Sequence, residues 1–298
     1  MRETDLLAHI ADRSKGLTGA YPGVVVVGPG DDCAVVRVGE GDTLLTVDQL
    51  VEGRHFAPQT AVDLIARKAV ARSISDIAAM GGTPRWGLAT GLLPRGYGHA
   101  DALFDAMARW GIEFGAPLVG GDVAMWDGGL VLTCTVGGVP HAVRGPVLRS
   151  GARTGDELWV TGRIGGSLAS GRHLTFVPRV AEGGWLCDVL GTDLHAMIDV
   201  SDGVGRDAAR LGAASGVAVE IDLSRVPLHQ GVGDSVRAIG EGEDYELLFA
   251  AAPGASLAAA TLQGTLLTRI GRFAVGSGCV SVDARGGRLE VSQRGWEH

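Results

Sequence analysis

Apolar residues recur along this chain with two periods, and the change from one period to the other predicts helices interleaved with strands. In residues 61–80 apolar side chains fall three or four positions apart, which is the spacing of a helix with one buried face. Gly81, Gly82 and Pro84 follow directly and predict the end of that helix. Residues 100–114 repeat the same spacing. We therefore expect two amphipathic helices in the first half of the chain.

Short runs of β-branched and apolar residues around these helices predict strands. The expected strands are residues 24–27, 33–38, 43–48, 86–93, 130–139, 157–162, 196–202, 217–222, 245–251 and 266–271. A further helix is expected at 203–216, and a stretch rich in Gly, Pro and Arg near 140–155 predicts a domain boundary. This order of elements indicates an α/β (α+β) fold, with an N-terminal domain at 1–140 and a C-terminal α/β domain at 141–298.

The composition argues against a nucleic-acid-binding, secreted or membrane protein. A net charge of −8 argues against general nucleic-acid binding, which needs clustered Lys and Arg. The N-terminus lacks the apolar core of a signal peptide, and no apolar run reaches the length of a membrane span. The four cysteines form no Cys-x-x-Cys pair, so we expect reduced, buried thiols. We expect a cytoplasmic protein that binds neither nucleic acid nor membrane.

Acidic residues stand beside glycine or at the ends of β-like runs throughout the chain. They are Asp31, Asp32, Asp48, Asp76, Asp122, Asp199, Asp202, Glu243 and Asp244. Taken singly, an Asp next to Gly is more often a turn or helix-cap residue than a ligand. If the fold brings them together, two carboxylates about 4 Å apart repel by about 4 kcal/mol at an effective dielectric of about 20, so cations are required. Carboxylate oxygens without His or Cys partners favour Mg²⁺, which also binds nucleotide phosphates.

The common nucleotide-binding motifs fit this chain poorly. Neither lysine, Lys15 nor Lys68, follows a glycine, so a P-loop is excluded. The protein-kinase signatures are also missing. A weak dinucleotide-binding pattern exists, because Gly-x-Gly-x-x-Ala at 203–208 opens a predicted helix and Asp222 lies further on. The acidic residues just before that turn would repel a pyrophosphate, which weakens a dehydrogenase interpretation.

All nine of these acidic residues fall within a set of eight short motifs, whose order along the chain is characteristic. The motifs are GDDCAV at 30–35, TVDQLVEGRHF at 46–56, SDIAAMG at 75–81, GGD at 120–122, RSGARTGD at 149–156, MIDVSDG at 197–203, GEDYELLF at 242–249 and RGWEH at 294–298. Together they resemble the motifs of the thiamine-monophosphate kinase family, within the superfamily that includes aminoimidazole-ribonucleotide synthetase. The resemblance spans nearly the whole chain.

The resemblance implies a two-domain fold like that of aminoimidazole-ribonucleotide synthetase, with a β-rich N-terminal domain that binds ATP and Mg²⁺ and pairs in a homodimer. It implies ATP-dependent phosphorylation of thiamine monophosphate to thiamine diphosphate. The implied Mg²⁺ ligands are Asp32, Thr46, Asp48, Asp76, Asp122, Asp199 and Asp202. The implied ATP contacts are Gly121, Asp122, Arg149 and Ser201, and the implied substrate contacts are His55, Glu243 and Trp296. Of these residues, Asp48, Asp122 and Asp202 are the ones implied in catalysis.

Three departures from the family pattern keep other interpretations open. Val47 stands where the family usually has Thr, Ser73 where it has Asn, and Val-Ala-Met at 123–125 where it has Thr-Thr-Arg. A related ATP-dependent enzyme that acts on another small phosphorylated substrate is therefore an alternative. A metal–nucleotide binding subunit without activity is another.

Overall fold

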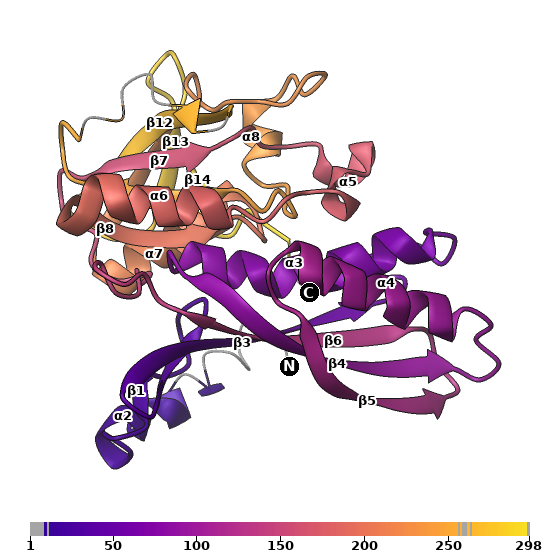
Figure 1. Cartoon of the computed structure of the whole chain (residues 1–298). Helices are drawn as coiled ribbons and strands as arrows, with labels where there is room; N and C mark the ends of the chain where they lie inside the picture. Colours follow the sequence, from indigo (N-terminus) through magenta and orange to yellow (C-terminus); the bar gives the residue numbers. More distant parts are fainter. Residues whose placement is uncertain (1–8, 11, 256, 258–260, 263, 297–298) are drawn as a thin grey trace.

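Two β-sheets, one from each half of the chain, form the framework of the molecule (Figure 1). The computed structural model describes residues 9, 10, 12–255, 257, 261, 262 and 264–296. Glu297 and His298, at the end of the last sequence motif, lie outside the described residues. Within the described part of the chain, no helix is long and apolar enough to cross a lipid bilayer. The expected mixture of helices and strands is confirmed.

The N-terminal sheet is antiparallel except at one edge. Its strands are β1 (Val25–Val27), β2 (Ala34–Val38), β3 (Gly41–Val51), β4 (Thr83–Pro94), β5 (Leu118–Trp126) and β6 (Val131–Val139), in the spatial order β1-β2-β3-β6-β4-β5. The edge strand β5 runs parallel to β4. Helix α4 (Ala100–Glu113) connects these two strands, as a parallel pair requires a crossover.

Helices α3 (Val62–Ala79) and α4 pack on one face of this sheet and leave its other face uncovered (Figure 1). Alternation along the strands decides which side chains meet the helices. On β3, Leu44 and Leu50 are buried in a core that includes Ile74 and Ile77 of α3. Val47, which points to the uncovered face, is 61% exposed. This half of the molecule is therefore a two-layer structure with one open face.

The C-terminal sheet is larger and is covered on both faces. Its strands are β7 (Glu157–Thr161), β8 (Leu194–Asp199), β9 (Ala218–Asp222), β10 (Leu247–Ala251), β12 (Thr265–Ala274), β13 (Cys279–Val282) and β14 (Arg288–Glu290), in the order β14-β13-β9-β12-β7-β10-β8, with β11 (Thr261–Leu262) paired to β12. The helices of this half are α5 (Ser167–Ser170), α6 (Val180–Leu190), α7 (Val204–Ser215) and α8 (Ser235–Ala238), and α2 (Leu17–Ala20) precedes the first sheet.

Successive residues of the central strands pack into two separate cores. Leu248 and Ala250 of β10 pack in the core that contains α7, whereas Leu247 and Phe249 pack in the core that contains α6. All five residues of β10 are buried. A strand buried on both faces is expected to be apolar throughout, which explains why the run from 247 to 251 lacks alternation.

Every strand and helix predicted above is present, with ends displaced by a few residues. Several elements were not predicted: the short α2, α5, α8, β11, β13 and β14, and the longer β5 and α6. The last two have a common explanation. Strand β5 and helix α6 both contain paired glycines, which in a sequence usually indicate a turn. A Cβ added at Gly121 would lie 1.7 Å from the carbonyl oxygen of Ala89, and one added at Gly183 would lie 2.5 Å from that of Ala78. These glycines therefore allow two backbones to approach closely rather than ending an element.

The predicted boundary between residues 140 and 141 falls in the connection between the two sheets. Strand β6 ends at Val139 and β7 begins at Glu157. The extents of the two domains stay a prediction.

Helix α6 offers a test of this close approach, because Gly183 and Gly184 are neighbours with different surroundings. Nothing lies within 4 Å of a Cβ added at Gly184. We expect Gly184→Ala to raise the free energy of unfolding by about 0.5–1 kcal/mol, because alanine favours the helix. We expect Gly183→Ala to lower it by about 1–3 kcal/mol, because the methyl group forces α6 away from α3. Chemical denaturation of both variants measures this, and equal stability of the two would contradict the packing described.

Candidate active site

A cavity of about 1080 Å³ opens between the two sheets, where α3, β3 and the loop after β8 meet. Most of the residues expected to bind metal, nucleotide or substrate line it. Those residues are Asp32, Thr46, Asp48, His55, Asp76, Arg149, Asp199, Ser201 and Asp202. The fold thus gathers side chains from both halves of the chain around one space.

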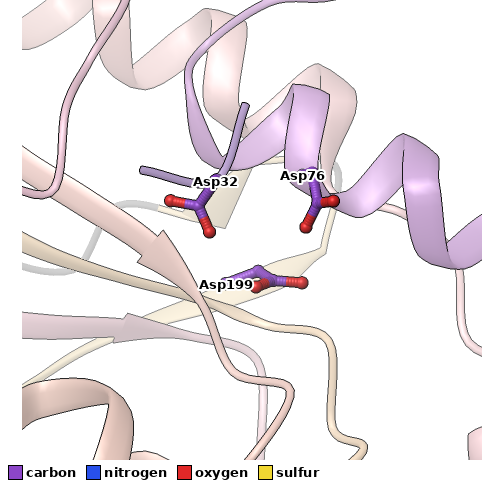
Figure 2. A group of neighbouring side chains, drawn as sticks. All are labelled: Asp32, Asp76 and Asp199. Atoms are coloured by element: carbon purple, nitrogen blue, oxygen red, sulfur yellow. The ribbon is translucent and has the colours of Figure 1, made fainter. Parts of the chain in front are cut away.

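Three carboxylates form the centre of this cavity (Figure 2). One oxygen from each of Asp32, Asp76 and Asp199 lies within 4.8 Å of the others. Asp32 lies in the turn before β2, Asp76 on α3 and Asp199 at the end of β8. The hydroxyl of Thr46 donates a hydrogen bond to Asp76, and the Oγ of Ser75 donates one of 2.6 Å to Asp199. Three separate elements and two hydroxyl groups therefore fix the positions of these carboxylates.

Burial and mutual repulsion oppose the ionised form of these carboxylates. Burial raises the pKa of Asp76 well above its usual value, and repulsion from nearby carboxylates, first that of Asp48, adds to the rise. Burial and then repulsion from Asp32 raise the pKa of Asp199 in the same way. The pKa of Asp31 is raised to about 6, by burial and then by its neighbour Asp32. A bound cation would favour the ionised forms and offset these penalties.

The donor atoms in this cluster fit a hard divalent cation. The three residues offer only carboxylate oxygens, and the cluster contains no His or Cys. Mg²⁺ prefers oxygen ligands, whereas zinc sites usually contain His nitrogen or Cys sulfur. Asp32, Asp76 and Asp199 are therefore residues that could hold Mg²⁺.

Arg149 closes one side of the carboxylate cluster. Its Nε and Nη2 donate to the two oxygens of Asp32 at 3.1 and 2.9 Å, and its backbone N–H donates to Asp31 at 3.0 Å. A bidentate pair of this kind fixes the orientation of the guanidinium group. Arg149 is thus held at the cavity wall, where a phosphate could meet its remaining edge.

Asp202, at the start of the loop that precedes α7, also lines the cavity, and Arg210 pairs with it at 2.5 Å. The carboxylate of the buried Asp207 accepts hydrogen bonds of 3.0 Å from the backbone N–H groups of Asp202 and Gly203. Those donors would otherwise be available to a pyrophosphate. Strands β8 and β9 are also not neighbours in the sheet, so the βαβ unit of a dinucleotide-binding fold is absent there. The dehydrogenase interpretation is therefore excluded.

The three residues expected to contact the acceptor substrate lie in different settings. His55 lines the cavity, and its Nδ1 accepts a 2.8 Å hydrogen bond from the backbone N–H of Val51. Trp296 is tied to the cavity wall because its backbone N–H donates to the carbonyl of Asp202 at 2.8 Å. The guanidinium of Arg54 lies 5.9 Å from the centre of the Trp296 ring. Glu243 is buried, and Lys68 donates a hydrogen bond to its carboxylate.

Of the residues expected to bind metal or nucleotide, Gly121 and Asp122 do not line the cavity. They lie on the exposed edge strand β5, in register with Ala89 and Thr90 of β4. Strands β4 and β6 separate β5 from β3, which carries Asp48. At about 4.8 Å between neighbouring strands, the separation across the sheet is roughly 14 Å.

Two charged residues of the site, Arg72 and Lys68, were missed in the sequence analysis. Arg72 lines the cavity, donates to the carbonyl of Gln49 at 2.7 Å and has its Nη2 3.5 Å from Asp48. Residues 68, 72 and 76 are spaced by four on α3, which places them on one face of the helix. Three charged residues at that spacing, on a helix predicted to have one buried face, are the signal that could have revealed them.

The amino-acid sequence is similar to a known family model and to several thiamine-monophosphate kinases. Residues 30–139 match the family model described as AIR synthase related protein, N-terminal domain. The thiamine-monophosphate kinase of Rhodopirellula baltica is 35% identical over 291 residues, which cover 91% of this chain and 89% of that protein. The thiamine-monophosphate kinase of Caulobacter vibrioides is 33% identical, covering 97% of this chain and 90% of that protein.

Solved structures give the same result for the fold. The structure of AaThiL complexed with AMPPCP and TMP superimposes with a TM-score of 0.82 at 26% identity, covering 100% of this chain and 97% of that one. The hydrogenase maturation protein HypE in complex with ATP gives a TM-score of 0.71 at 19% identity, covering 88% of each chain, and so shares the fold. The expected fold, that of the aminoimidazole-ribonucleotide synthetase superfamily, is confirmed.

The electrostatics of the cluster predict a pH-dependent response to Mg²⁺. The raised pKa values of Asp76 and Asp199 mean that their contribution to stability is complete below about pH 4, the unfolded value, and is lost as pH rises through the folded value. Metal binding needs the ionised carboxylates. We therefore expect Mg²⁺ to raise the melting temperature more at about pH 8 than at about pH 5. Differential scanning fluorimetry with Mg²⁺ and without it measures this.

The variant that tests this expectation is Asp76→Asn, which removes one ionisable carboxylate and keeps the side-chain size. This variant should lose most of the Mg²⁺-dependent rise in melting temperature. A rise of the same size in the variant and the unaltered protein would contradict the assignment of Mg²⁺ to this cluster.

Proposed function

Because this chain belongs to the thiamine-monophosphate kinase family, we propose that it transfers the γ-phosphate of ATP to thiamine monophosphate and so forms thiamine diphosphate and ADP. The observation that carries the proposal is the convergence of Asp32, Asp76 and Asp199 in the large cavity between the sheets. Such a cluster suits a metal–nucleotide complex, because Mg²⁺ is commonly held jointly by carboxylates and phosphates. AMPPCP, bound by a relative, is an analogue of ATP.

The proposed chemistry needs positioning and charge neutralisation rather than a general base. The acceptor is a phosphate monoester, whose second pKa is about 6, so it is largely a dianion at neutral pH and can attack directly. Bound Mg²⁺ would supply charge neutralisation for the phosphate oxygens. The residues that would hold it are Asp32, Thr46, Asp48, Asp76, Asp122, Asp199 and Asp202. Transfer is then direct and in line, without a phosphoenzyme.

The remaining residues divide between the two substrates. Arg149 and Ser201 line the cavity and would contact phosphate oxygens of ATP, with Gly121 from strand β5. His55, Glu243 and Trp296 would recognise thiamine monophosphate. The Trp296 ring can stack on a cationic thiazolium, an interaction that is strongest with tryptophan.

One of the departures from the family pattern does not touch this cavity. Ser73 is completely buried, and its hydroxyl donates a 2.9 Å hydrogen bond to the carbonyl of Cys134. A change at this position therefore affects packing between α3 and β6 rather than the choice of substrate. The described cysteines are all buried and unpaired, which suits the reducing cytoplasm that we propose for this enzyme.

The uncovered face of the N-terminal sheet supports a homodimer. Exposed apolar side chains on this face are Val47, Leu88, Leu92 and Trp126. A polar row also crosses it, because Gln49, Thr133, Thr90 and Asp122 are in register on β3, β6, β4 and β5. Exposed apolar patches of this kind mark interaction sites. We propose that two copies pair through this face and that Gly121 and Asp122 complete the nucleotide site of the dimer.

The reaction itself is tested by incubating the purified protein with Mg²⁺, ATP and thiamine monophosphate. We expect thiamine diphosphate and ADP in equal amounts, and Asp48→Asn should lower the rate at least tenfold because it removes charge beside the metal cluster (~1.4 kcal/mol per tenfold). Asp127→Asn, at an exposed surface ion pair, is the matched control and should retain the full rate. ADP without thiamine diphosphate, or formed only with another acceptor, would favour a related enzyme with a different substrate.

The dimer is tested with Leu88→Asp and Leu92→Asp, which place a charge on the uncovered face. We expect both to shift the mass measured by light scattering from dimer to monomer and to lower the rate at least tenfold, because the site would lack Asp122 (~1.4 kcal/mol per tenfold). Ile112→Asp, an equally drastic change at an exposed position of α4, should leave the mass unchanged. A monomeric and fully active unaltered protein would overturn this proposal.

A further inference from the structure

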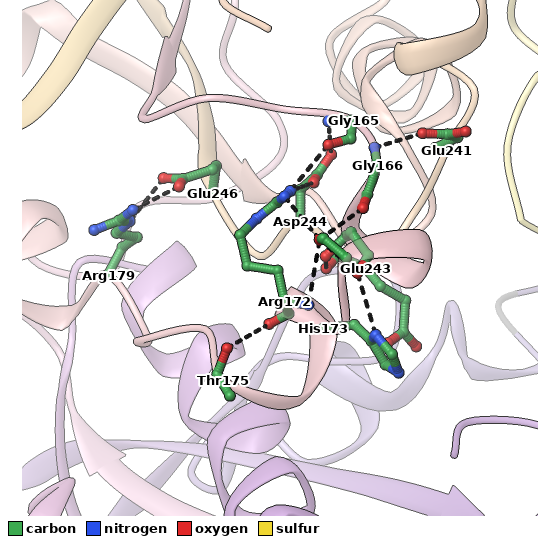
Figure 3. A network of polar contacts seen from close by, with 12 residues as sticks. Gly165, Gly166, Arg172, His173, Thr175, Arg179, Glu241, Glu243, Asp244 and Glu246 are labelled. Carbon is green, nitrogen blue, oxygen red and sulfur yellow. Dashed lines mark hydrogen bonds and ion pairs between the residues drawn. The ribbon is translucent and has the colours of Figure 1, made fainter. Parts of the chain in front are cut away.

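A short acidic segment, residues 241–246, lies beside the cavity, and each of its carboxylates has its own cation. The pairs are Glu241 with Arg237, Glu243 with Lys68, Asp244 with Arg172, and Glu246 with Arg179. Figure 3 shows two of these pairs, Asp244 with Arg172 and Glu246 with Arg179. Glu243, Asp244 and Glu246 are buried. Buried carboxylates need such partners, because an unpaired buried charge is strongly destabilising.

The backbone of this segment is held in an unusual conformation. Glu243 and Tyr245 have φ values of 66° and 52°, in the left-handed region that residues other than glycine rarely adopt. Their backbone N–H groups donate to the carbonyls of Ser201 and Val200 at 2.7 and 2.8 Å. Ser167 Oγ adds a 2.6 Å hydrogen bond to the carbonyl of Glu243. A strained segment persists only where its surroundings fix it, as these contacts do here.

Lys68 differs from the other three cations because it comes from the opposite half of the molecule. It lies on α3, is completely buried, and donates a 2.7 Å hydrogen bond to the carbonyl of His55 and another to the carboxylate of Glu243. Burial lowers the pKa of Lys68 to about 8, and Glu243 opposes this shift. One ammonium group therefore joins the turn that carries His55 to the segment that carries Glu243 and Tyr245.

We propose that Lys68 is a positioning residue for the acceptor substrate. This proposal rests on the proposed function, because His55 and Glu243 are among the residues assigned above to thiamine monophosphate. His55 and Tyr245 both line the cavity, so movement of either attachment point would change its shape. The residues assigned to ATP depend on other contacts, since Arg149 is held by Asp31 and Asp32. Loss of Lys68 should therefore weaken recognition of thiamine monophosphate and leave recognition of ATP nearly intact.

The first test compares Michaelis constants in Lys68→Met, which removes the charge and keeps an unbranched side chain. We expect the KM for thiamine monophosphate to rise at least tenfold and the KM for ATP to change by less than about threefold. Arg179→Met is the matched control, because it removes the cation of another buried carboxylate, Glu246, that does not line the cavity. It should lower the melting temperature with both KM values unchanged. Equal effects of the two variants on the KM for thiamine monophosphate would overturn the proposal.

A second comparison covers the case in which Lys68→Met does not fold because Glu243 is left unpaired. The double variant Lys68→Met/Glu243→Gln has no unpaired charge at this position and is compared with Glu243→Gln alone. If Lys68 acts through Glu243, the two should share one raised KM for thiamine monophosphate to within about threefold. A further rise of tenfold or more in the double variant would show that Lys68 does not act through Glu243, and would contradict the proposal.

Calorimetry separates this inference from the proposed function. Thiamine monophosphate is titrated into the unaltered protein and into Lys68→Met, each with Mg²⁺ and AMPPCP present, so no turnover is needed. Binding to the unaltered protein that weakens at least tenfold in the variant supports the role of Lys68, even if no thiamine diphosphate is formed and the proposed reaction fails (~1.4 kcal/mol per tenfold). Equal affinity for the two proteins, or no binding to either, contradicts it.

Discussion

The repulsion between carboxylates buried in one cavity is the constraint on which the rest of this site depends. Asp32, Asp76 and Asp199 converge from three elements, and their burial raises the pKa of both Asp76 and Asp199. Positively charged side chains neutralise only part of this negative charge. Arg149 pairs with Asp32, but none of the salt bridges of the described residues includes Asp76 or Asp199. The cluster therefore suits cations that arrive from solution, and in the function we propose a nucleotide–metal complex would supply them together with phosphate.

Helix α3 connects this constraint to the fold. One face of the helix packs Ile74 and Ile77 into the N-terminal sheet core. Three charged residues spaced by four along the helix, Lys68, Arg72 and Asp76, reach Glu243, Asp48 and the carboxylate cluster. The helix is thus buried on nearly all sides, yet this one row carries three charges whose partners lie on other elements. Such a helix fixes the distance between Glu243, which we assign to the acceptor substrate, and the carboxylate cluster, which we assign to the metal.

The sequence predicted the strands, the main helices and most of the cavity residues, because these depend on periodicity and on ordered motifs. It could not predict β5 or α6, since Gly121 and Gly183 look like turn residues and are explained only by a neighbouring backbone. It missed Lys68 and Arg72 for a related reason: a charged residue on a helix is normally solvated, and only tertiary packing buries these two. The place of Asp122, far across the sheet from Asp48, depends on strand order, which no local pattern fixes.

We propose above all that Asp32, Asp76 and Asp199 bind metal together with nucleotide phosphates. A crystal structure of the protein with Mn²⁺ in place of Mg²⁺ and with AMPPCP tests it most directly, because Mn²⁺ is located by its anomalous scattering. We expect anomalous peaks within bonding distance, about 2.1–2.3 Å, of oxygens from these three residues and from the triphosphate. Peaks confined to other parts of the molecule, with the nucleotide bound away from the cluster, would contradict it.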